Sequence, residues 1–192
     1  MLVLNGSPRK NGTVAKLLKS AVNAVPKQHE VEWVDVYDLK IEHCVACMKC
    51  RPDKECVLPE DDAHMLGRKI RKADGLMVGT PTHWGNMSAK LKLVFDRNVP
   101  AIMGEKKNGL PDPLHKGKPA LIATACATPW PFNFILAQSR GSIRAVKEIL
   151  NMGGYRVVGE LAQPGTKKMT AIPDGILKES RNLGSKFAGS SS

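Results

Sequence analysis

Short apolar runs alternate along this chain with segments in which apolar residues recur every three or four positions. The runs span 1–5, 31–39, 75–81, 119–126 and 155–161, and each has the length of a buried strand. The helical stripes that follow them start at Val14, Leu66, Met87, Ile143 and Ile176. Strands that alternate with helices form a parallel sheet with helices on both faces. The chain is therefore predicted to fold as an α/β three-layer sandwich around a five-stranded parallel sheet.

The length of 192 residues suits one hydrophobic core, so we expect a single domain over 1–188 with a frayed tail at 189–192. The segment 98–116 breaks the alternation with prolines, glycines and charges, and we predict an excursion loop there. No apolar run approaches the roughly 18 residues of a membrane span. The opening "MLVLNGSPRK" reads directly as a strand and leaves no room for a signal peptide. We therefore expect a cytoplasmic protein with reduced thiols and no membrane partner.

The net charge is strongly positive, with 29 basic and 18 acidic residues giving +11. Such a charge favours an anionic partner, which could be nucleic acid, a phosphorylated cofactor or an acidic protein. The basic residues are scattered, and no nucleic-acid-binding motif accompanies them. We therefore expect a solvated basic surface and no specific nucleic-acid partner.

The first loop at the predicted carboxyl edge of the sheet is "NGSPRKNGT" (5–13). Parallel sheets bind ligands at this edge. The loop combines two glycines, which allow close approach of the backbone, with two hydroxyl side chains and an arginine. The helix that follows attracts anions to its N-terminus. Neither the dinucleotide nor the nucleoside-triphosphate fingerprint is matched, so we predict a cradle for a simple phosphate group.

The second loop at this edge lies within "GTPTHWGNMSAKLKLVFDR" (79–97). Turn-forming residues there surround an imidazole, His83, and an indole, Trp84. An aromatic side chain at a strand end can cover a planar ligand, and backbone amides can bond the edge of a ring. On these residues alone, ordinary packing of Trp84 and a surface position for His83 explain the loop equally well.

The two loops together resemble the flavodoxin-like NAD(P)H-dependent FMN reductase family. "NGSPRKNGT" is similar to the phosphate loop of that family, and "TPTHWGNMSAKLKLVFDR" to its second flavin loop, helix and terminal Asp-Arg. The resemblance covers most of the chain and implies a flavodoxin-like fold, FMN as cofactor, NAD(P)H as electron donor and a homodimer or homotetramer. It places the FMN phosphate among Ser7, Arg9, Asn11, Gly12 and Thr13. It places the isoalloxazine along Pro81, Thr82, His83, Trp84, Gly85, Asn86 and Met87.

The third flavin loop is expected after the fourth strand, at "TACATPWPF" (124–132). This segment departs from the glycine-rich form that is common in the family, and we predict flavin contacts from Ala125 and Thr128. Cys126 is expected to be a small core residue. Because flavin carries the chemistry in such enzymes, we expect no catalytic side chain.

Four of the five cysteines lie in "CVACMKCRPDKEC" (44–56), with the spacing C-x2-C-x2-C-x5-C. This spacing is close to a ferredoxin run, whereas zinc sites usually divide their ligands into two distant pairs. It also resembles the motif of iron–sulfur flavoproteins, a branch of the same fold with one [4Fe–4S] cluster beside FMN. The turn formers Pro52, Asp53 and Lys54 would swing the last cysteine back toward the others. The predicted ligands are Cys44, Cys47, Cys50 and Cys56, with zinc and bare thiols as the alternatives.

Two enzymatic functions and one other therefore remain open. In the first, NAD(P)H reduces FMN, which passes electrons to a small acceptor such as a quinone or another flavin. In the second, a [4Fe–4S] cluster relays electrons between an acidic ferredoxin and FMN, and the positive charge suits that partner. The third is a regulatory or nucleic-acid-associated flavodoxin-like protein, which the charge allows but no motif supports.

Overall fold

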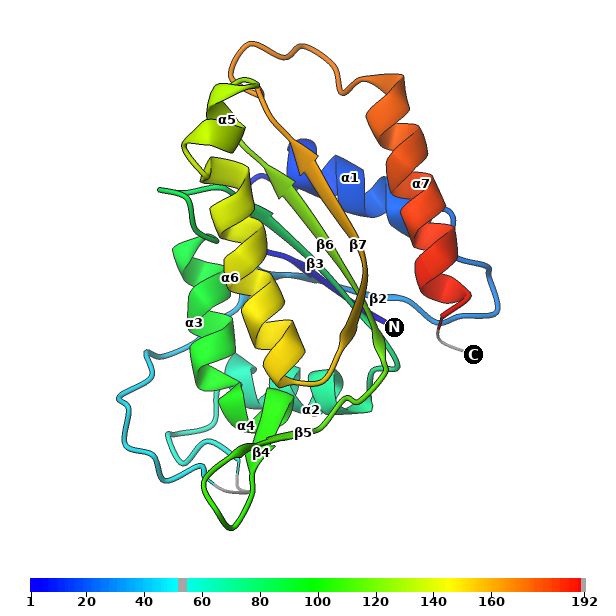
Figure 1. Cartoon of the computed structure of the whole chain (residues 1–192). Helices are drawn as coiled ribbons and strands as arrows, with labels where there is room; N and C mark the ends of the chain where they lie inside the picture. Colours follow the sequence, from blue (N-terminus) through cyan, green and yellow to red (C-terminus); the bar gives the residue numbers. More distant parts are fainter. Residues whose placement is uncertain (52–54, 191–192) are drawn as a thin grey trace.

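The computed structural model describes residues 1–51 and 55–190. The turn predicted at Pro52, Asp53 and Lys54 and the tail residues 191–192 lie outside the described residues. The centre of the molecule is a five-stranded sheet with the order β2-β1-β3-β6-β7, in which every pair is parallel (Figure 1). This confirms the predicted α/β architecture and its five strands. Their bounds are β1 Leu2–Asn5, β2 Glu32–Asp35, β3 Leu76–Pro81, β6 Pro119–Ala125 and β7 Arg156–Gln163.

Helices cover both faces of the sheet, as the alternating pattern predicts (Figure 1). One face is covered by α1 (Thr13–Val22) and α7 (Asp174–Ala188). The opposite face is covered by α2 (Asp62–Lys72), α3 (Ala89–Arg97) and α6 (Gln138–Met152). The strand order reverses direction between β1 and β3, and this is where open parallel sheets hold their ligands, beyond the carboxyl ends of the strands.

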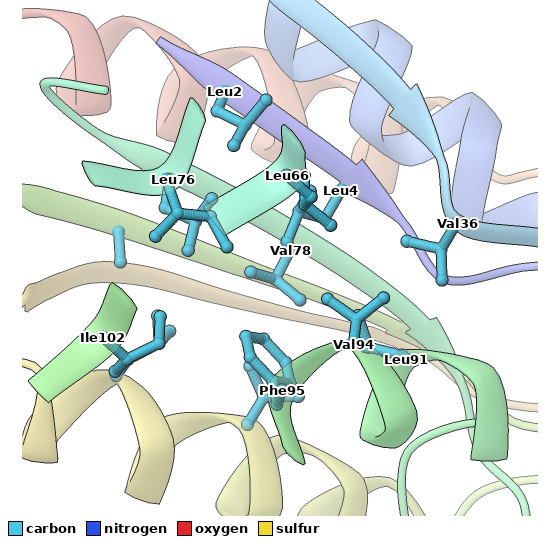
Figure 2. Packing of buried hydrophobic residues seen from close by; sticks show 14 of the residues in the cluster. Leu2, Leu4, Val36, Leu66, Leu76, Val78, Leu91, Val94, Phe95 and Ile102 are labelled. Carbon is cyan, nitrogen blue, oxygen red and sulfur yellow. The ribbon is translucent and has the colours of Figure 1, made fainter. Parts of the chain in front are cut away.

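Leucine, isoleucine, valine and phenylalanine side chains fill the space between the sheet and its second helical layer. Figure 2 shows Leu2, Leu4 and Val78 of the strands facing Leu66 of α2 and Leu91, Val94 and Phe95 of α3. All of these side chains are at most 3% exposed. The core therefore fixes α3 firmly against the sheet, and α3 begins directly after the second predicted flavin loop.

The helices α1 and α7 pack on each other at very short range. A Cβ atom built on Gly184 would lie 2.0 Å from the backbone oxygen of Ala21, so only glycine allows this approach. Two serine hydroxyls reinforce the contact: Ser180 Oγ donates to Leu17 O at 2.6 Å, and Ser20 Oγ donates to Leu177 O at 3.0 Å. The last long helix is therefore locked onto the first.

Three segments differ from the sequence-based prediction. The second strand is short, because a 3-10 turn, η1 (Val36–Asp38), replaces its predicted second half. The segment 98–116 is an excursion with structure of its own: a helical turn, α4 (Val99–Ile102), and an antiparallel pair, β4 (Met103–Glu105) and β5 (Pro111–Pro113). A further short helix, α5 (Phe132–Ile135), occupies the predicted third loop.

Within the part of the chain that the structure describes, no helix is both long enough and apolar enough to span a membrane.

Candidate functional site

The loop between β1 and α1 leaves a free helix N-terminus at the carboxyl edge of the sheet. Gly12 is the N-cap residue of α1, has an extended backbone, and provides no side chain to bond the first amides of the helix. The first turn of α1 also carries no acidic residue. The first amide donors of a helix have no partner inside the helix and carry partial positive charge. This end of α1 is therefore suited to hold an anion.

The start of the loop is fixed by the strand that precedes it. The side chain of Asn5 is buried, donates to Asp35 Oδ1 at 2.7 Å and accepts the amide of Ser7 at 3.3 Å. Ser7 is only 5% exposed, and its Oγ accepts the amide of Arg9 at 3.2 Å. These bonds define the path of the loop without any ligand.

The five predicted phosphate residues all lie in this one turn. Ser7 is buried, Gly12 and Thr13 form the beginning of α1, and Arg9 and Asn11 are exposed. Asn11 Oδ1 accepts a hydrogen bond from Lys19 at 3.3 Å, whereas the Arg9 guanidinium has no ion-pair partner among the described residues. The arrangement leaves an exposed arginine beside an uncapped helix terminus.

The second predicted loop forms a tight turn at the end of β3. The backbones of His83 and Asn86 bond each other in both directions at 2.9 Å. Between them, Trp84 and Gly85 have φ angles of 53° and 70°, in the left-handed region. The Trp84 side chain is 100% exposed, so it is not a packing residue within this chain.

Thr82 and Met87 flank this turn. The Thr82 amide donates to Ala125 O at 2.8 Å and thereby ties the turn to the end of β6. Met87 is buried and lies before the start of α3, not within the helix as the sequence pattern predicted. Pro81 closes β3.

Ser88 joins the first two loops and was not predicted from the sequence. It is fully buried, and its Oγ donates to Gly6 O at 2.7 Å and accepts the amide of Leu91 at 3.4 Å as the N-cap of α3. Its own amide donates to Thr80 Oγ1 at 2.9 Å. A serine three residues before the helical stripe at Leu91 is an N-cap signal, but its contact with Gly6 depends on the tertiary fold.

Three hydroxyl groups meet below the turn. Thr82 Oγ1 lies 3.0 Å from Ser142 Oγ and 3.2 Å from Thr124 Oγ1, and the latter two are 3.0 Å apart. They come from β6, from α6 and from the loop after β3, so no local sequence pattern predicts this cluster. The cluster fixes Thr82 beside the predicted flavin region.

The third loop presents apolar side chains to solvent. Ala125 ends β6 and is nearly buried, and Thr128 O accepts the amide of Gly165 at 3.0 Å. Beyond them, α5 and its neighbours expose large side chains: Trp130 76%, Phe132 57%, Phe134 54%, Ile135 65% and Leu136 60%. Cys126 is buried, as expected for a small core residue.

The four clustered cysteines line a single cavity. Together with Asp96, Arg97 and Val99, they enclose a volume of about 320 Å³. Cys44 and Cys47 are exposed, Cys50 and Cys56 are partly buried, and burial raises the pKa of the Cys50 thiol. Among the residues described, no three histidine, cysteine or acidic side chains are already close enough to hold a metal ion. The loop thus gathers the cysteines around one space without bringing their sulfurs to ligating positions.

The backbone of this loop is unusual. Ala46 and Met48, which flank Cys47, have positive φ angles of 51° and 59°. Non-glycine residues adopt such angles rarely, so the backbone of this loop follows an uncommon path. Residues in the left-handed region occur in the concave amide arrangements that bind anions, including iron–sulfur clusters.

A buried ion pair anchors the end of the cysteine loop. The Arg97 side chain, at the end of α3, is 0% exposed and bonds both carboxylate oxygens of Asp61, at 2.8 and 3.2 Å. Burial raises the pKa of Asp61, but amide bonds from Glu42 and Ala63 and the bonds from Arg97 lower it by more, so the net shift is downward. The pair was not predicted, because its members lie far apart in the chain.

The cysteine cavity and the second flavin loop lie toward opposite ends of α3, although Arg51 of the cysteine loop also lines a further cavity with Asn86 and Met87 of the flavin loop. The cavity contacts α3 at Asp96 and Arg97, the C-terminal end, whereas the second flavin loop leads into the N-terminal end. Nine residues at about 1.5 Å each place about 14 Å between the two ends. In Figure 1 the cyan loop accordingly lies at the end of α3 that is close to α4.

Comparison with known proteins identifies the relatives of this chain. An iron–sulfur flavoprotein of Methanocaldococcus jannaschii is 32% identical over 102 residues, which are 53% of this chain and 52% of that protein. One of Methanosarcina thermophila is 35% identical over 97 residues, 50% of each chain. The chain thus spans about half the length of the curated relatives it matches.

Solved structures with the same fold include several flavin enzymes. The apo form of an NADH:FMN oxidoreductase has a TM-score of 0.67 and 23% identity, over 98% of this chain and 88% of that one. An azoreductase has a TM-score of 0.75 and 15% identity, over 97% of this chain and 99% of that one. Residues 1–160 match the family model described as NADPH-dependent FMN reductase. Because this match covers most of the chain, including both loops and the cysteine cavity, the protein belongs to the NADPH-dependent FMN reductase family.

Proposed function

We propose that the protein is an FMN-dependent oxidoreductase in which NAD(P)H reduces the flavin and a small acceptor, such as a quinone or a second flavin, reoxidises it. The observation that carries this proposal is the uncapped N-terminus of α1, which lies beside Ser7 and the exposed Arg9 at the carboxyl edge of the sheet. A single phosphate group suits a site of this kind.

The residues of the edge fit FMN. A Cβ at Gly12 would lie only 2.9 Å from Arg9 Cβ, so a side chain there would force the loop to shift. The exposed Trp84 and the backbone of the turn around it would lie along the planar ring, and the Ala125 and Thr128 region would border its far side. The charged phosphate would thus contact the start of α1, and the planar ring would contact the turn around Trp84.

When bound, FMN supplies the redox chemistry by accepting a hydride and passing electrons to the acceptor. The chain binds and orients the cofactor. The amides of α1 and Arg9 hold the phosphate, and Ser88 sets the distance between the first two loops through Gly6. The hydroxyl cluster of Thr82, Thr124 and Ser142 holds the second loop in place.

The test is to identify the flavin and the reaction separately. Flavin released by heat from purified protein should run as FMN in chromatography, and apoprotein should take up FMN in preference to FAD. The reconstituted protein should then oxidise NADH or NADPH in the presence of a quinone. Uptake of FAD alone, or of no flavin, would contradict the proposal.

A second candidate function adds a [4Fe–4S] cluster in the cysteine cavity, with an acidic ferredoxin as electron partner. The supporting observation is that all four cysteines line one cavity, whose wall also includes Ala46 and Met48 with their positive φ angles. The net charge of +11 suits an acidic partner. Anaerobic reconstitution with ferrous iron and sulfide should load about four irons per chain, the stoichiometry of the cluster. Protein that binds FMN but no iron would leave the NAD(P)H reductase function alone.

A further inference from the structure

Arg97 is the buried cation of the cysteine cavity. Its Nη1 donates to Glu42 O at 2.7 Å and to Asp61 Oδ2 at 2.8 Å, and its Nη2 donates to Asp61 Oδ1 at 3.2 Å. The other two charged residues of the cavity wall are different: Arg51 is paired with Glu105 at 3.5 Å, and Asp96 with Lys92, all on partly exposed side chains.

Part of the Arg97 guanidinium remains available. The group carries five N–H donors, of which the bonds above use three. The Nε donor is buried and has no hydrogen-bond partner among the described residues. Leaving a buried charged donor unused costs free energy, so such a donor calls for an explanation.

Cys56 shares the walls of two cavities with Arg97. Cys56 and Arg97 line the cysteine cavity together, and they also line the small adjoining cavity of about 20 Å³. Burial lowers the pKa of Arg97, but its interactions with the Cys56 side chain and with Asp61 raise it by more. The guanidinium bonds the Asp61 carboxylate, and its buried Nε donor is left for a further acceptor such as a sulfur.

Cys56 is also held through its backbone. Its carbonyl oxygen lies 2.9 Å from His64 Nε2, and His64 Nδ1 accepts the amide of Asp61 at 3.2 Å. These bonds are consistent with a proton on Nε2, which donates to the carbonyl of Cys56. Cys44 and Cys47, by contrast, are exposed.

We propose that Arg97 is a positioning residue for an iron–sulfur cluster: when the cluster is bound, the free donor edge of Arg97 holds the sulfur of Cys56 as a fixed ligand, and its charge offsets the negative charge of the cluster. This inference rests on the second candidate function. The reduced cluster carries one more negative charge than the oxidised one, so a buried cation beside it stabilises the reduced form more. Hydrogen bonds to cluster sulfurs and nearby charge both tune the reduction potential.

The test uses the full chain, loaded with FMN and reconstituted anaerobically with ferrous iron and sulfide. Arg97→Gln removes the charge, Arg97→Lys keeps it without the planar donor edge, and Arg51→Gln is the matched control on the same cavity wall. The measurements are the rate of iron release to a chelator and the midpoint potential of the cluster. Bound FMN and the thermal unfolding midpoint report on the fold.

Arg97→Gln should release iron about ten- to a hundredfold faster than the unsubstituted protein, the usual cost of losing a residue that supports a metal ligand. Its remaining cluster should have a lower midpoint potential. Arg97→Lys should release iron faster but keep a potential closer to the original, and Arg51→Gln should change both only slightly.

Three results would overturn the inference in distinguishable ways. Faster iron release with an unchanged potential in Arg97→Gln would show that Arg97 only stiffens the loop. Equal effects of Arg51→Gln and Arg97→Gln would show that the position of the charge is irrelevant. An unsubstituted protein that binds FMN but loads no iron would remove the cluster function and this inference together, while leaving the NAD(P)H reductase proposal intact.

Discussion

The loop after β1 and the loop after β2 leave neighbouring strands at the same edge of the sheet, yet they are supported very differently. The first is bonded to β2 through Asn5 and to the start of α3 through Ser88, and its Ser7 is buried. The second exposes Cys44 and Cys47 and is fixed mainly at its end, where Asp61 meets Arg97. Bonds to the sheet and to α3 thus hold the phosphate loop, whereas a few contacts near its ends hold the cysteine loop, among them the pair of Asp61 with Arg97 and the contact of His64 with the Cys56 carbonyl.

Removing that ion pair should give the largest effect. Asp61→Ala leaves the buried Arg97 cation unpaired, and breaking a buried pair costs about 3–5 kcal/mol of unfolding free energy. Denaturant unfolding would measure this loss, and limited proteolysis should cut first between 42 and 58. Glu105→Ala, which breaks the exposed Arg51 pair, is the control and should cost less than about 1 kcal/mol. Similar losses of unfolding free energy in both variants would mean that the buried pair stabilises the protein no more than the exposed pair does.

A side chain added at the start of the phosphate loop should destabilise the protein through steric overlap. A Cβ at Gly6 would lie 2.8 Å from Gly79 O and 3.0 Å from Leu91 Cβ, both within the rigid core. Gly6→Ala should therefore cost about 3 kcal/mol, the upper end for overpacking, and FMN uptake should fall with it. Gly175→Ala, which has no atom within 4 Å of the new Cβ, is the control and should be neutral or stabilising. A stable Gly6→Ala variant would show that the phosphate loop can shift to accept the extra methyl group and is not held rigidly by the core.

Substitution of Arg9 tests whether the same loop binds the FMN phosphate. Its side chain is exposed, so Arg9→Ala should leave stability unchanged while weakening FMN binding by about 1.5–3 kcal/mol, the scale of a hydrogen bond to a charged group. Quenching of flavin fluorescence would measure the affinity. The exposed Lys16, farther along α1, provides the control substitution Lys16→Ala. Unchanged affinity in Arg9→Ala would mean that this side chain faces only solvent.

Acid should weaken the anchor of the cysteine loop before it affects the phosphate loop. The pKa of Asp61 is lower in the folded protein than in the unfolded chain, where it is about 3.9. Its stabilising contribution is complete above the unfolded value and is lost as the pH falls through the folded value. A single group contributes at most about 1.4 kcal/mol per pH unit to this slope. Asp61→Asn should make the unfolding free energy depend less on pH at acid pH. An unchanged dependence would mean that other carboxylates cause it.

The smallest effect is expected within the exposed part of the cysteine loop. Cys47→Ala removes a solvent-exposed side chain, so the unfolding free energy and FMN affinity should change by less than about 0.5 kcal/mol. Cys126→Ser, in the core, should cost more because it buries a hydroxyl. If Cys47→Ala also destabilised the protein without iron, the loop would contribute to the fold more than its exposure indicates.

The fold was largely predictable because each strand and helix carries its own local signal. The runs at 1–5, 75–81 and 119–126 became β1, β3 and β6 with bounds differing by one residue at most. Elements without an apolar pattern were missed: the pairing of β4 with β5 depends on a turn among charged residues, and α5 exposes its aromatic side chains.

The candidate site was predictable only where its residues are adjacent in the chain. The residues from Ser7 to Thr13 are adjacent and form one turn, so a sequence motif can predict it. The hydroxyl cluster and the pairing of Asp61 with Arg97 bring together residues from different elements, and their meeting depends on the packing of α3 and α6. The capping box of Asp61 and His64 could have been recognised locally, because a D-x-x-H sequence precedes the apolar stripe of α2. In the usual capping box the last residue is Glu or Gln, and here it is His64.

The lock between α1 and α7 bears on how the molecule comes together during synthesis. Ribosomes deliver the N-terminal part first, and it begins to fold while later residues are still being made. The face of α1 that Gly184, Ser180 and Leu177 cover therefore stays open to water and to other chains until about 160 further residues have emerged, counted from Ala21 to Gly184. A nascent chain of this protein would be most prone to aggregation, and most dependent on chaperones, in that interval.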